Sequence, residues 1–194
     1  DHLHTGASRP SGLINGTRVA TRVHEELVWR DVGELSVSDE VLTFDSGFQS
    51  IIAVEKALLW ADPAACAPQD APYYVPAGAL GNLDPVALVA HQHAIVESDL
   101  AEEMTGDPFA LLPVEALAGW KGIVRMKPTA PRVIVGLHFN TDQVIYAADG
   151  ALLLVQAGAT VLDHVFGNAG YVALDAPETR AVADSLRAEE VLCA

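Results

Sequence analysis

Residues 11–21 read SGLINGTRVAT, and this stretch carries the first clear signal of a fold. Gly12 and Gly16 stand four residues apart, Thr17 follows, and the next residues alternate between polar and apolar side chains. A glycine-rich element followed by an alternation of period two is typical of a turn that leads into a β-strand. We therefore expect a strand at Arg18–Val23.

The same pattern of short apolar runs between turn residues continues through most of the chain. A second strand should follow a turn near His24, and DEVLTF (39–44) should be a strand that ends at the turn 45–47. Residues 86–98 are expected to form one buried strand, and 131–139 and 142–156 a pair around the turn at 140–142. Asp175 can cap a helix from about 177 to 191. The predicted fold class is all-β, an antiparallel β domain with short helical insertions and a C-terminal helix.

Composition narrows the functional classes. The chain has 194 residues, of which 51% are hydrophobic and 19% charged, so it can bury one core and is not disordered. Its net charge of -15 would repel phosphates, which excludes a nucleic-acid partner. The longest apolar stretch (150–162) is too short and too rich in glycine to span a bilayer. We expect a soluble protein, and its acidity suits secretion or an extracellular or surface assembly, although the compartment stays open.

The two cysteines, Cys66 and Cys193, leave two readings open: one disulfide, or two free thiols. No Cys-x-x-Cys is present, which excludes a zinc ribbon and a thioredoxin-like site. The sequence begins at Asp1 and not at Met, and we therefore expect that a segment upstream was removed or left out.

Three stretches together resemble one known family. They are 12–51, which includes GELSVSDEVLTFD, then 75–97, which includes AHQHAIV, and 133–154. In order and spacing they resemble the Hint (hedgehog/intein) domain, particularly the Hint-type domains of alphaproteobacteria, over residues 11 to 156. GELSVSDEVLTFD is similar to the family's E-x-L-x-x-G-D-x-V-L-T element, with Ser38 in place of glycine. AHQHAIV is similar to the family's S-P-Q-H-R-V-L block.

The resemblance implies autoprocessing chemistry. In active Hint domains a first-position Cys or Ser attacks the preceding carbonyl, and a histidine of the second block helps to protonate the departing amine. That histidine matches His93, whereas the nucleophile position is Gly12 and the usual hydroxyl residue three before the histidine is Ala90. The resemblance therefore predicts a domain that has lost autoprocessing. Ser11, one residue upstream, is the alternative nucleophile.

We therefore expect a structural or protein-binding module in a larger assembly or polypeptide, whose partners are other subunits or its own upstream region. The alternative is a self-cleaving domain that uses Ser11 with His93. A third reading is a metal-dependent hydrolase in which His91 and His93 share a metal with His138 or His24, but we expect neither a metal nor a cofactor. The acidic segment 97–107 lacks the spacing of an EF-hand and favours a helix start.

The expected division of the chain is an N-terminal tail or linker (1–11), a Hint-like domain (12–156) and a C-terminal extension with a helix (157–194).

Overall fold

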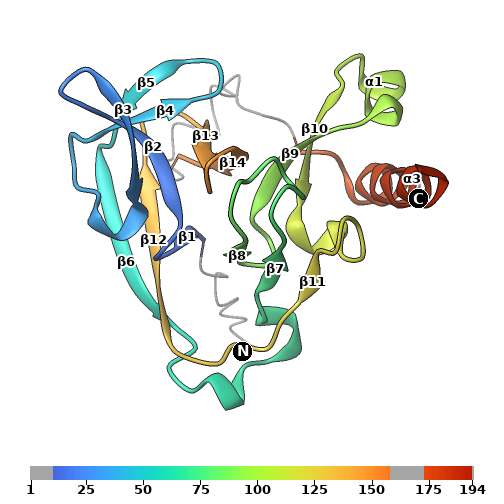
Figure 1. Cartoon of the computed structure of the whole chain (residues 1–194), viewed down its shortest axis with the longest axis horizontal. Helices are drawn as coiled ribbons and strands as arrows, with labels where there is room; N and C mark the ends of the chain where they lie inside the picture. Colours follow the sequence, from blue (N-terminus) through green and yellow to red (C-terminus); the bar gives the residue numbers. More distant parts are fainter. Residues whose placement is uncertain (1–10, 158–172, 194) are drawn as a thin grey trace, which may run out of the picture.

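Strands dominate the computed structural model, which describes residues 11–157 and 173–193 (Figure 1). They form three sheets, and every strand pair in the described residues is antiparallel. The expectation of an all-β, Hint-like antiparallel domain with short helices and a C-terminal helix is confirmed. The expected tail lies outside the described residues, apart from Ser11.

The largest sheet runs in the order β10-β9-β14-β13-β2-β4-β5, with β3 added on β2. Its strands are β2 (Arg18–Val23), β3 (Glu26–Asp31), β4 (Glu40–Thr43), β5 (Gly47–Ser50), β9 (His93–Glu97), β10 (Phe109–Pro113), β13 (Gln143–Ala147) and β14 (Ala151–Val155). Strand β4 alternates between half-buried and buried side chains, as the pattern of DEVLTF predicts.

Two smaller sheets complete the β structure. One has the order β1-β12-β6 and the other β11-β7-β8. Their strands are β1 (Leu13–Ile14), β6 (Ala53–Leu59), β7 (Tyr73–Val75), β8 (Val86–Leu88), β11 (Val124–Arg125) and β12 (Arg132–His138).

The helical segments are short except for the last one. They are the 3-10 turns η1 (Val32–Glu34), η2 (Pro63–Ala65), η3 (Pro68–Asp70) and η4 (Val114–Leu117), and the α-helices α1 (Asp99–Thr105) and α3 (Ala176–Cys193). Helix α1 begins where the acidic segment was expected to start a helix, and the Ser98 hydroxyl accepts a hydrogen bond from the Ala101 amide. No helix in the described residues has both the length and the apolar composition of a bilayer span.

Two turn positions explain local features of the sequence. His24 and Glu25 both have a positive φ, which gives the β2–β3 hairpin a two-residue turn that matches the twist of its strands. Ser38 has a φ of +74°, a left-handed conformation that glycine adopts without strain. The glycine in the motif that this segment resembles therefore has a physical reason, and Ser38 holds the same turn at a cost.

The expectation of one strand over residues 86–98 is wrong. Strand β8 ends at Leu88, the Gln92 amide then donates to the Val89 carbonyl in a turn, and β9 begins at His93 in a different sheet. An apolar run shows that a segment is buried, but it does not show where the segment passes from one sheet to another.

The expected pairing of residues 131–139 with 142–156 is also wrong. Strand β12 pairs with β1 and β6, whereas β13 turns back at Ala148–Gly150 and pairs with β14. The two candidate turns both contain favourable residues, and pairing with distant strands decides which one closes a hairpin.

Helix α3 packs on the β structure at the end away from β3, β5 and β6 (Figure 1). Its first turn is closed by reciprocal hydrogen bonds, because Asp175 accepts from the Glu178 amide and Glu178 accepts from the Asp175 amide. Val182 and Leu186 are buried in the main core cluster, which contains residues of all three sheets. The helix therefore docks by the apolar stripe that its sequence predicts, and the division at residue 157 stays a prediction.

Candidate functional site

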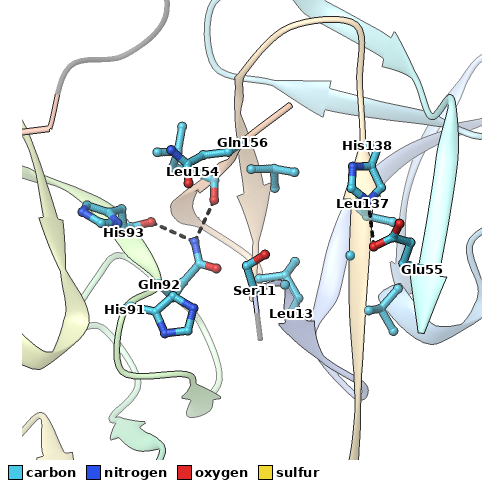
Figure 2. A pocket seen from close by; sticks show the side chains of 14 residues that line it. Ser11, Leu13, Glu55, His91, Gln92, His93, Leu137, His138, Leu154 and Gln156 are labelled. Carbon is cyan, nitrogen blue, oxygen red and sulfur yellow. Dashed lines mark hydrogen bonds and ion pairs between the residues drawn. The ribbon is translucent and has the colours of Figure 1, made fainter. Parts of the chain in front are cut away.

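A small cavity lies where the sheet β1-β12-β6 meets the ends of β9 and β14 (Figure 2). Its lining brings together residues from five separate parts of the chain: Ser11 to Leu13, Glu55, His91 to His93, Val135 to His138, and Leu154 to Gln156. Its volume is about 80 Å³. Cavities that take a separate organic ligand usually have about 300–1,000 Å³, so this one suits a peptide group or a few waters.

Gly12 lies against the backbone of β12. Because β1 pairs Leu13 with Val135, the Gly12 backbone approaches the Val135–Gly136 peptide directly. A Cβ atom on Gly12 would lie 2.5 Å from the Val135 carbonyl oxygen and 2.8 Å from its carbon. Gly12 also has a φ of +136°, which L side chains rarely adopt. The position therefore accepts only glycine unless β12 moves.

Ser11, Gly12 and His93 all line this cavity. In Figure 2 the His93 ring turns away from Ser11, and Gln92 lies between the two. Burial lowers the pKa of the His93 imidazole below its usual 6.5, against the opposing effects of a hydrogen bond to the His91 backbone and of the Glu115 carboxylate. The ring is thus neutral at neutral pH.

Gln92 is a site residue that the sequence reasoning missed. Its side chain is buried, and its amide nitrogen donates to the carbonyls of His93 and Leu154. These hydrogen bonds join the start of β9 to the end of β14, two segments of the cavity wall. One signal was available in the sequence: Gln92 is a polar residue within the mostly apolar run 86–96.

His138 and Glu55 form the opposite wall (Figure 2). The Nε2 atom of His138 lies 3.4 Å from a Glu55 carboxylate oxygen, and this contact is an ion pair only when the imidazole is protonated. The side chain of Glu55 is mostly exposed, and nothing in the sequence around it predicts that it lies beside this cavity. Ala90 is buried and offers no hydroxyl.

The third reading required a metal site on His91 and His93. Both residues and His138 line the cavity, but His24 does not. Within residues 11–157 and 173–193, no group of three or more His, Cys, Asp or Glu side chains is arranged to hold a metal ion. The geometry therefore gives the metal-dependent reading no ligand set. Cys66 is a free thiol, and the side chain of Cys193 lies outside the described residues.

The chain belongs to the Hint domain family, whose sequence model matches residues 11–153. Among solved structures, the crystal structure of the gp41-1 intein is similar at 12% identity, with a TM-score of 0.43, over 74% of this chain and 98% of that one. No curated protein matches the sequence.

Proposed function

We propose that this Hint domain has lost autoprocessing and serves as a structural or protein-binding module within a larger assembly or polypeptide. The observation that carries the proposal is the geometry of Gly12, the residue that the family resemblance assigns to the nucleophile position. It has no side chain, and the Val135 carbonyl leaves no space for one. Cleavage of an amide requires an attacking oxygen or sulfur atom, and residue 12 supplies neither.

Two further features support the loss of activity. Ala90 replaces the hydroxyl residue that precedes the histidine in the resembling motif, so one polar contact to the reacting peptide is missing. His93 has a lowered pKa, so little of it is protonated at neutral pH. A general acid must carry a proton to give to the departing amine, and this group is a weak candidate for that role near pH 7.

The test is a fusion of a reporter protein to the natural residues upstream of Ser11, followed by intact mass spectrometry after prolonged incubation. We expect one mass equal to the encoded chain. Two complementary fragments that meet near residue 11 or 12 would overturn the proposal.

The same fusion with Gly12→Cys tests whether the framework lacks only its sulfur. Because a side chain at residue 12 collides with the β12 backbone, we expect neither cleavage nor a thiol-dependent release of the reporter. Release that depends on dithiothreitol would show that β12 moves aside and that the rest of the machinery is intact.

The second candidate function is self-cleavage with Ser11 as nucleophile and His93 as its partner. It is favoured by one observation: the exposed Ser11 lines the same cavity as His93. In this reaction the Ser11 hydroxyl would lose its proton to a base and attack the carbonyl of residue 10, so the peptide bond becomes an ester and the freed amine takes a proton. Water would then hydrolyse the ester, which restores the Ser11 hydroxyl and releases the upstream segment as a carboxylic acid. For His93 to accept the hydroxyl proton, its ring would have to turn towards Ser11 from the orientation in Figure 2.

Ser11→Ala separates the two candidates if any cleavage is observed. Abolition by Ser11→Ala but not by Ser36→Ala, a change at another exposed serine, would establish the second function. Equal cleavage in all three proteins would exclude Ser11 as the nucleophile.

A further inference from the structure

A second, larger cavity lies between helix α3 and the β domain. It has a volume of about 530 Å³, within the range of pockets that hold small organic ligands. One wall consists of residues on a single face of α3, including Arg180 and Arg187. The other wall comes from β7, β9, η4 and β11, including Arg125, Glu115 and His93.

The charge of this cavity is opposite to that of the chain. The protein has 26 acidic and 11 basic side chains, yet three arginines and only one acidic residue, Glu115, line the cavity. Arginine presents a planar fork of N–H donors that matches a carboxylate or phosphate. A gathering of this kind in a strongly acidic protein indicates a site that attracts an anion.

The three arginines do not have the same role. Arg187 is used by the fold: its guanidinium donates to the carbonyls of Ala116 and Ala118 and pairs with Asp184. Arg125 donates from Nε and one Nη to the Tyr73 hydroxyl, which is a neutral partner and leaves its charge uncompensated.

Arg180 is exposed and forms no hydrogen bond or ion pair with any residue of 11–157 and 173–193. Arg125 likewise has no carboxylate partner in that part of the chain. Two guanidinium groups with unused donors therefore face one cavity.

We propose that the cavity between α3 and the β domain binds a carboxylate group, carried by a small organic ligand or by a polypeptide terminus. The planar forks of donors on Arg125 and Arg180 match the two oxygens of a carboxylate group. The Tyr73–Arg125 contact holds the fork in place, and the ring of Tyr73 lies 5.3 Å from the guanidinium carbon.

This site is separate from the cavity beside Gly12, and the two share only His93 in their linings. Binding of a carboxylate in this cavity does not depend on whether the domain cleaves itself. A test of this inference is therefore independent of the test of the proposed function. The shared histidine supplies a reporter, because its ring resonances will respond to a ligand that enters the arginine-lined cavity.

The experiment is an NMR titration of the full chain with sodium benzoate, with benzamide as a neutral ligand of the same shape. Benzoate should shift the resonances of His93 and of the Arg180 guanidinium in a saturable way, and benzamide should not. Arg180→Ala should weaken benzoate binding at least about tenfold, since hydrogen bonds to charged groups are strong. Arg132→Ala, which removes one charge from an exposed position on β12, should change it less than about twofold.

Further arms distinguish the possible ligands. Tighter binding of acetyl-Val-Ala than of its C-terminal amide would support recognition of a polypeptide terminus, and preference for benzoate would support a small ligand. Arg125→Met provides a second variant, which should also weaken binding of benzoate. The proposal is overturned if benzamide binds as well as benzoate, if inorganic phosphate binds more tightly, if Arg132→Ala has the same effect as Arg180→Ala, or if no shift saturates.

Discussion

Gly12→Ala is the substitution that most directly tests the description of the site. A methyl group at residue 12 would lie 2.5 Å from the Val135 carbonyl oxygen, on a backbone whose φ of +136° already disfavours any side chain. Gly16 is a matched control four residues away, since it has a φ of +96° and no atom within 4 Å of an added Cβ. Both variants carry the conformational cost, and only Gly12→Ala carries the collision.

The two costs can be estimated separately. A residue forced into a glycine-only conformation costs about 1–3 kcal/mol. An additional methyl group in a well-packed site costs about 1–3 kcal/mol more. We therefore expect Gly16→Ala to lower the free energy of unfolding by about 1–3 kcal/mol and Gly12→Ala by about 2–6 kcal/mol.

Urea denaturation followed by tryptophan fluorescence measures this difference, and a thermal scan provides a second readout. For a chain of this size about 1 kcal/mol shifts the melting temperature by about 2–4 °C, so Gly12→Ala should melt about 2–12 °C below Gly16→Ala. If the two variants are equally stable, the close approach of Gly12 to β12 is not a feature of the folded protein. The steric argument for the loss of the nucleophile would then fail.

Three further changes test other parts of the structure. Ser38→Gly should raise the free energy of unfolding by about 0.5–1 kcal/mol. The strain energy that glycine relieves in the left-handed conformation exceeds the conformational entropy that it adds to the unfolded chain. A lower urea midpoint for this variant would contradict the prediction. The pKa of His93 is lower in the folded than in the unfolded chain, so the unfolded chain takes up a proton at this residue first as the pH falls. The free energy of unfolding is therefore unaffected by this residue above about pH 6.5, and it decreases as the pH falls from there towards the folded pKa. Urea midpoints measured from about pH 7.5 to pH 5 should therefore fall less steeply in His93→Gln, and identical slopes would refute the shift. Leu186→Ala should cost about 2–5 kcal/mol, whereas Val191→Ala, at an exposed position of the same helix, should change stability by less than about 0.5 kcal/mol; equal effects in thermal scans would show that α3 does not dock by this stripe.

Local patterns in the sequence were sufficient for several elements. The β2–β3 hairpin follows from two alternating runs around His24, and α3 follows from an Asp175 cap and an apolar stripe at Val182 and Leu186. These elements depend on side chains only a few residues apart, so local periodicity and capping residues predict them from the sequence. The family resemblance extended that reading to residues far apart, and the cavity does bring Ser11 and His93 together.

Other features depend on contacts between distant segments, and the sequence alone does not show them. The break between β8 and β9 and the pairing of β13 with β14 depend on which sheet each strand joins. The glycine requirement at residue 12 arises because the Val135 carbonyl, more than a hundred residues later, occupies the space of its side chain. The sequence alone determined that residue 12 lacks a nucleophile. Only the tertiary structure decided that β12 leaves no room for one, because steric exclusion depends on which backbone the fold places opposite the glycine.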